Sequence, residues 1–76
     1  MKIKILGPGC PKCKMLAANV QEAVSKMGID AEISKVENID EIMKYGVMVT
    51  PGLVVDEVVK SAGKVLSVEE IKKIIS

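Results

Sequence analysis

Apolar and charged side chains alternate at the start of the chain, where Ile3 and Ile5 are separated by Lys4. Such alternation is typical of a half-buried strand and predicts one over residues 1–6. From residue 13 onward the apolar positions instead recur every three or four residues, the spacing of one face of a helix. They are Cys13, Leu16, Ala17, Val20, Val24 and Met27. The pattern therefore predicts a helix over residues 11–27.

Two shorter elements are predicted next. Residues 29–36 alternate well enough for a second strand, and Gly28 marks the end of the preceding helix. Asn38, followed three residues later by Glu41, has the form of a capping box, which opens a helix. We therefore expect a helix of about two turns over residues 38–45.

The last third of the chain predicts a hairpin and a final helix. Residues 53–55 and 58–60 are strand segments joined by residues 56–57. Two-residue hairpin loops need positive φ and favour glycine, so this joint predicts either strain or a longer loop. Ser67 and Glu70 form a second capping box, and one apolar face of the helix that follows is expected to point inward. It consists of Val68, Ile71, Ile74 and Ile75.

The predicted order is strand, helix, strand, helix, strand, strand, helix. A strand, helix and strand at the start favour a parallel crossover. A length of 76 residues allows one domain. We therefore predict a single α/β domain over residues 1–76, with a four-stranded mixed sheet flanked by three helices.

Composition and charge narrow the classes of partner. The chain has 11 basic and 10 acidic residues and a net charge of +1, and neither sign forms a run. It has one tyrosine and no phenylalanine or tryptophan, so almost no aromatic side chain is available to stack on nucleic-acid bases. We expect neither nucleic acid nor a membrane as partner, since no stretch is apolar enough to span a bilayer. Residues 1–4 enter a strand pattern without an apolar leader, which favours a cytoplasmic location.

The only two cysteines, Cys10 and Cys13, lie between the first strand and the first helix. Pro11 suits the first helical position, which makes Cys10 the cap residue. The unpaired N–H groups and the positive end of the helix dipole favour a thiolate there, and Lys12 and Lys14 add positive charge. We therefore predict that Cys10 is a nucleophile with a lowered pKa, tuned by Pro11 and Lys12.

Cys13 lies one helical turn further on, in the apolar stripe. Positions i and i+3 are neighbours on a helix, so Cys13 is within reach of a mixed disulfide between Cys10 and a substrate. We expect Cys13 to attack that disulfide and release the reduced substrate. Gly7 and Gly9 are expected to let the backbone approach the two sulfurs closely.

A metal site is the main alternative use of two thiolates. Structural zinc needs four ligands, and the chain has no histidine and no third cysteine, so no metal site of that kind is predicted. Soft-metal chaperones also place CxxC between a strand and a helix, and Cu(I) accepts thiolates. Their order of elements would be β-α-β-β-α-β, which differs from the order predicted here. The alternatives are a copper chaperone, a redox-sensing binding module and a scaffold with inert cysteines.

The predicted order, with Cys-Pro-Lys-Cys after the first strand and Thr-Pro before the third, resembles the thioredoxin-like fold in its minimal, glutaredoxin-sized form. The similarity covers the whole chain and is greatest to small archaeal and bacterial thioredoxin-like redox-active disulfide proteins. It rests on residues 7–13, 28–31 and 50–53 and on the terminal Glu-Glu-Ile-Lys-Lys-Ile.

The resemblance implies a cis Pro51 beside the disulfide, with the backbone of Thr50 free to pair with a substrate strand. It also implies that Cys10 attacks and Cys13 resolves. We therefore predict a thiol-disulfide oxidoreductase that reduces protein or small-molecule disulfides. No nucleotide-binding motif is present, so we expect no bound cofactor. Electrons are expected from a thioredoxin-reductase-like enzyme or a glutathione-linked thiol pool, and a monomer is expected.

Overall fold

The computed structural model describes residues 1–75, and its elements follow the order predicted from the sequence. They are β1 (Lys2–Leu6), α1 (Pro11–Met27), β2 (Glu32–Val36), α2 (Ile39–Lys44), β3 (Gly52–Val55), β4 (Val58–Ala62) and α3 (Val68–Ile75). β2 begins at Glu32 rather than at residue 29. Residues 29–31 instead carry the chain back from the end of α1 to the level of Lys2, where pairing with β1 begins.

The four strands form one mixed sheet in the order β2-β1-β3-β4. β1 pairs parallel with β2 and antiparallel with β3, and β3 pairs antiparallel with β4. All four residues of β3 are buried, as expected for a central strand that is covered on both faces. The loop that follows β1 therefore starts from one of the two central strands, β1 and β3, each of which is paired on both sides.

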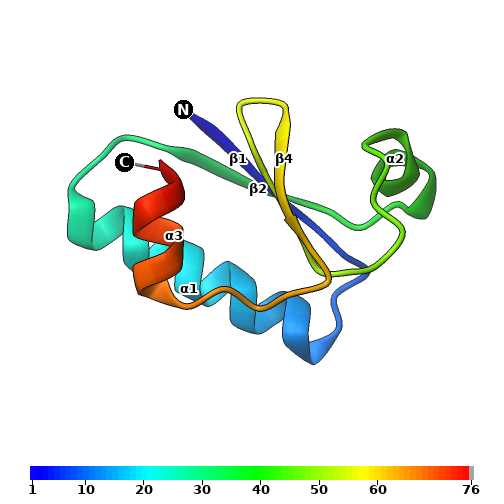
Figure 1. The fold of residues 1–76 in the computed structure, drawn as a ribbon, viewed down its shortest axis with the longest axis horizontal. Coiled ribbons are helices and arrows are strands. Elements are labelled where there is room, and N and C mark those ends of the chain that lie inside the picture. The colour runs from blue at the N-terminus through cyan, green and yellow to red at the C-terminus, as the bar shows by residue number, and fades with distance from the viewer. Residues whose placement is uncertain (76) are drawn as a thin grey trace.

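The sheet presents opposite faces to two groups of helices (Figure 1). Ile3 and Ile5 of β1 belong to the larger apolar cluster, which includes residues of α1 and α3. Leu6 and Val54 belong to the smaller cluster, which includes Ile42 of α2. We call these two sides the α1/α3 face and the α2 face. Alternate side chains of β1 therefore pack into two different apolar clusters, one on each face of the sheet.

The predicted capping boxes form to different extents. At α3 the box is complete, because Ser67 and Glu70 exchange two hydrogen bonds of 3.2 Å between side chain and backbone N–H. At α2 only half of it forms. The Asn38 side chain accepts a hydrogen bond from the Glu41 N–H at 3.3 Å, whereas the Glu41 carboxylate pairs with Lys44 at 3.3 Å.

The hairpin between β3 and β4 closes with a two-residue turn, so strain is observed rather than a longer loop. Asp56 and Glu57 both adopt the left-handed backbone conformation, with φ of 49° and 68°. Lys4 Nζ donates hydrogen bonds to Glu57 Oε1 at 2.8 Å and to the Tyr45 hydroxyl at 2.6 Å. The Tyr45 hydroxyl donates to Glu57 Oε2 at 3.1 Å. This Lys4/Tyr45/Glu57 cluster joins β1, the strained turn and the end of α2.

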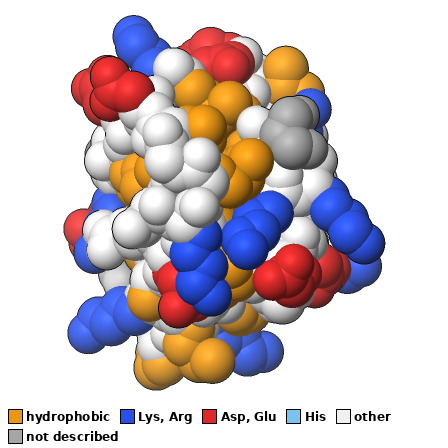
Figure 2. All heavy atoms as spheres, turned by 90° about the vertical axis from the view of Figure 1, so that its left-hand side faces the viewer, with side chains coloured by type: hydrophobic (Ala, Val, Ile, Leu, Met, Phe, Trp, Pro, Cys, Tyr) orange, Lys and Arg blue, Asp and Glu red, His pale blue; other side chains and the backbone are white. Residues whose placement is uncertain are grey.

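The surface carries charges of both signs. On the end of the molecule shown in Figure 2, lysines and acidic residues are interspersed with apolar side chains. This view agrees with the small net charge of +1. Among residues 1–75, no helix is both long and apolar enough to cross a membrane.

Candidate active site

The two cysteines lie where β1 leads into α1. As predicted, Cys10 is the cap residue of α1 and Pro11 is its first residue. Cys13, in the first turn, is only 5% exposed, whereas Cys10 is half-buried. Both are free thiols. Residues 7–13 comprise the loop before α1 and the first residues of that helix, and we call them the CxxC loop. This segment therefore presents one sulfur to solvent and keeps the other inside.

Hydrogen bonds around the Cys10 sulfur favour its thiolate. The Cys13 N–H donates to Cys10 Sγ at 3.3 Å. The pKa of Cys10 is lowered, first by a hydrogen bond from the Cys13 thiol and then by the N–H groups of Cys13, Lys12 and Cys10 itself. Lys12 thus acts on this sulfur through its backbone, while its side chain is exposed. Pro11 has no N–H and a φ suited to the first helical position, so the donors come from the residues around it.

Burial acts in the opposite direction on Cys13. Removal of the sulfur from water raises the pKa of the Cys13 thiol, and its hydrogen bond to Cys10 raises this pKa further. Backbone N–H groups of Cys10 and Gly9 oppose the increase in part. The pair therefore combines one sulfur that favours the thiolate with one that favours the thiol.

Gly7 brings Thr50 close to Cys13. A Cβ atom at Gly7 would overlap the Cys13 sulfur and would lie 3.8 Å from the Thr50 Cβ. Only glycine lets the backbone pass this close to the sulfur, as expected from the sequence. The peptide bond between Thr50 and Pro51 is cis, and Pro51 is buried. The structure thus gathers Thr50 and Cys13 around one glycine, and Cys10 is hydrogen-bonded to Cys13.

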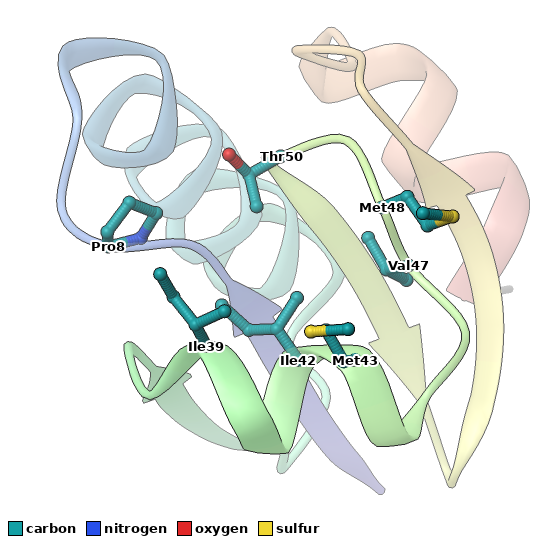
Figure 3. A pocket seen from close by; sticks show the side chains of 7 residues that line it. All are labelled: Pro8, Ile39, Ile42, Met43, Val47, Met48 and Thr50. Carbon is teal, nitrogen blue, oxygen red and sulfur yellow. The ribbon is translucent and has the colours of Figure 1, made fainter.

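An apolar groove of about 280 Å³ extends from Pro8 and Thr50 along α2 (Figure 3). Ile39 and Met43 of α2 line it, together with Met48 of the segment that leads to β3. The other lining residues are Ile42 and Val47. Ile39 is 63% exposed, Met43 58% and Met48 89%. Several large apolar side chains left in water beside the CxxC loop are typical of a contact surface.

Comparison with known proteins identifies the family. A family model described as a thioredoxin domain matches residues 1–76. The chain belongs to the thioredoxin-domain family. It is 51% identical to a thioredoxin of Methanothermobacter thermautotrophicus over 76 residues, which cover 100% of this chain and 99% of that protein. It is 52% identical to a thioredoxin of Methanocaldococcus jannaschii over 71 residues, covering 93% of this chain and 81% of that protein.

Membership of the thioredoxin family confirms the predicted fold and class of activity. The order β-α-β-α-β-β-α with a four-stranded mixed sheet is a minimal thioredoxin fold. The protein is a protein disulfide oxidoreductase. The order differs from the β-α-β-β-α-β order that a soft-metal chaperone would have. Within the described residues, 1–75, no group of three or more His, Cys, Asp or Glu side chains is placed to hold a metal ion.

The apolar groove of this thioredoxin-family chain is not among the features predicted from the sequence. The available signal was the density of apolar residues immediately before the Thr-Pro pair, where residues 47–49 are all apolar. A short helix and a neighbouring loop cannot bury that many side chains at once.

Proposed function

We propose that this protein reduces disulfides by dithiol exchange, with Cys10 as the attacking sulfur and Cys13 as the resolving sulfur. The observation that carries the proposal is the asymmetry of the pair. Cys10 is accessible and has a lowered pKa, whereas Cys13 is 5% exposed and has a raised pKa. The thiolate is the nucleophile in disulfide exchange, so the accessible sulfur with the lowered pKa acts first.

The exchange has two steps. The Cys10 thiolate attacks one sulfur of the substrate disulfide, whose S–S bond breaks as a mixed disulfide forms, and the departing thiolate takes a proton from solvent. Cys13 then loses its proton and attacks Cys10 Sγ. The mixed disulfide breaks, the bond between Cys10 and Cys13 forms, and the second substrate thiolate leaves. The substrate gains two electrons, and the protein dithiol loses them.

We further propose that polypeptide substrates dock through Thr50 and the apolar groove. The groove adjoins Thr50 and Pro8, which places it next to the CxxC loop. Its exposed walls suit an apolar side chain of the substrate near the disulfide, because contact with Ile39, Met43 and Met48 would remove apolar surface of both partners from water. The backbone of Thr50, before the buried Pro51, would pair with the substrate strand.

Electrons return to the disulfide from a thioredoxin-reductase-like enzyme or a glutathione-linked thiol pool, and no bound cofactor takes part. We propose that the protein acts in the cytoplasm as a monomer with a single domain over residues 1–76.

Cysteine variants test the assignment of the two sulfurs. We expect Cys10→Ser to abolish reduction of insulin by dithiothreitol-recycled protein. Cys13→Ser should instead accumulate mixed disulfides with insulin chains, detected by mass spectrometry. In a Cys13→Ala variant, which has no side-chain donor, the alkylation rate of Cys10 by iodoacetamide should follow a pKa closer to the ordinary cysteine value, because the largest contribution to the lowered pKa is lost. Turnover by Cys10→Ser would overturn the assignment.

A further inference from the structure

Two methionines from different segments line the apolar groove beside the CxxC loop. Met43 belongs to α2, and Met48 lies in the segment between α2 and β3 (Figure 3). Met48 is 89% exposed, the highest fraction of any large apolar side chain within residues 1–75, and Met43 is 58% exposed. Solvent and small oxidants therefore reach both side chains in the free protein.

An exposed thioether is open to oxidation by hydrogen peroxide. The sulfur loses two electrons, the O–O bond of the peroxide breaks, one oxygen atom becomes bonded to sulfur and the other leaves as water. The product, methionine sulfoxide, is polar, whereas the thioether is apolar. At Met43 and Met48 this change would alter the surface that we propose contacts polypeptide substrates.

Oxidation at these two positions should cost the fold little. Neither Met43 nor Met48 belongs to either buried cluster, and both already lie largely in water. An oxygen added to an exposed sulfur stays hydrated, so no buried polar group is left without a partner. In a docked complex the same oxygen would lose its water to an apolar contact, which is unfavourable. The effect should therefore fall on docking and not on folding.

We propose that Met43 and Met48 are oxidation sites through which peroxide weakens the docking of polypeptide substrates. The inference rests on the proposed function, because it needs the groove to receive a side chain of the substrate. A small-molecule disulfide needs only to reach Cys10, which does not line the groove. Oxidation of the two methionines thus changes which class of disulfide the protein reduces, while the exchange chemistry itself is retained.

The methionines can be oxidised while the cysteines are protected. Diamide first converts the dithiol to the disulfide, because a free thiolate would itself be oxidised to sulfenic and sulfinic acids. Hydrogen peroxide is then added, and dithiothreitol afterwards restores the dithiol but leaves the sulfoxides. Peptide mass spectrometry locates each added oxygen. Failure of the untreated protein to form the disulfide or to reduce insulin would overturn the proposed function, and this inference with it.

We expect peroxide treatment to raise KM for insulin about tenfold with little change in kcat, because two apolar contacts with the substrate are lost. The single-turnover reaction with 2-hydroxyethyl disulfide should keep its untreated rate, and the urea unfolding midpoint should not move. Methionine sulfoxide reductases that act on the two sulfoxide epimers should return KM to its original value.

Leucine variants separate the groove from the rest of the surface. Leucine is apolar and close to methionine in volume, but it has no sulfur to oxidise. The Met43→Leu/Met48→Leu double variant should therefore keep its KM after peroxide treatment. Met15→Leu is the matched control, because Met15 is also 58% exposed but lies on α1 outside the groove. This variant should remain as sensitive to peroxide as the wild type.

Three results would overturn the inference while the proposed function stands. The first is an unchanged KM in wild-type protein that carries both sulfoxides. The second is an equal rise of KM in the double variant, which would place the effect elsewhere in the molecule. The third is a lack of oxygen at Met43 and Met48 under conditions that oxidise Met15.

Discussion

The two faces of the sheet are built from the same kinds of aliphatic side chain but are covered to very different degrees. On the α1/α3 face, two helices close over a large cluster in which Leu16 and Ile71 are fully buried. On the α2 face, a six-residue helix contributes one buried residue, Ile42, to a much smaller cluster. Beside it, Ile39 and Met43 remain largely in water.

The difference indicates that one face of the sheet contributes mainly to stability, whereas the other keeps apolar surface exposed. Most of the apolar surface removed from water lies on the α1/α3 face, so that face supplies most of the hydrophobic stabilisation. The α2 face leaves apolar surface uncovered beside Pro8 of the CxxC loop, and this is the surface that we propose contacts substrate. The CxxC loop joins the two, because Cys13 packs inside while Pro8 lines the open groove.

The same substitution on the two faces tests this division most strongly. Leu16 and Leu6 are both fully buried, Leu16 on the α1/α3 face and Leu6 on the α2 face. Large-to-small changes cost about 2–5 kcal/mol, and the cost rises where the site cannot collapse. We expect Leu16→Ala to lie near the upper end of that range and Leu6→Ala near the lower end, measured by urea unfolding. Equal losses would contradict the view that the α2 face is less closely packed.

A change at Gly7, where the CxxC loop passes the Cys13 sulfur, should affect both the stability of the fold and the resolving step. Gly7→Ala would push a methyl group against the Cys13 sulfur, so we expect a loss of about 1–3 kcal/mol in unfolding free energy and slower resolution by Cys13. The matched control is Gly46→Ala, where φ is 78° but nothing lies within 4 Å of the new Cβ. The control should lose stability through backbone strain alone. Normal resolution kinetics in Gly7→Ala would show that the loop relaxes without moving the sulfur.

Two methionines of equal exposure separate binding from stability. Met43 lines the groove on α2, whereas Met15 lies on α1 outside it, and each is 58% exposed. We expect Met43→Gln to raise KM for insulin about three- to tenfold, because apolar contact with the substrate is lost. Its reaction with a small aromatic disulfide should be unchanged.

Met15→Gln serves as the control and should keep the wild-type KM for insulin. Similar unfolding midpoints for both variants would show that neither change acts through the fold. If both variants raise KM alike, the groove is not a specific docking surface.

The smallest expected effect concerns the link between the α2 face and the hairpin. The Lys4 ammonium and then the Tyr45 hydroxyl hold the pKa of Glu57 below its usual range. A carboxylate with a lowered pKa stabilises the fold above its unfolded-state pKa, and the contribution is lost as pH falls through the folded-state value. We expect Glu57→Gln to lower the melting temperature by about 1–3 °C at pH 7, because the pair is exposed.

Acidification should remove that difference, since both proteins then carry an uncharged side chain at residue 57. Glu22→Gln provides the control, because Glu22 pairs with Lys26 at 3.8 Å on the exposed side of α1 and touches no turn. A difference at residue 57 that persists in acid would point to the packing of the side chain rather than to its charge.

Local patterns along the chain were sufficient to predict the order of the elements and the placement of the two cysteines. Alternation in β1, the helical spacing of α1 and the position of Pro11 depend on nearest neighbours, and the structure confirms each. The same local logic predicted that Cys10 would cap α1 and that Cys13 would face inward. It failed at Glu41, whose carboxylate turns to Lys44 instead of closing the capping box, because two local partners compete for one side chain.

The surroundings of the two sulfurs were decided only by the tertiary structure. Thr50 approaches Cys13 because β3 pairs with β1, and Glu37 lies close to Gly9 because β2 pairs with β1 on its other side. Residues this distant in sequence meet through strand pairing, which no local periodicity encodes. The sequence by itself determined that two cysteines lie one turn apart at the start of a helix, since that depends only on local spacing and on Pro11. Which other groups surround the two sulfurs depends on how distant strands assemble.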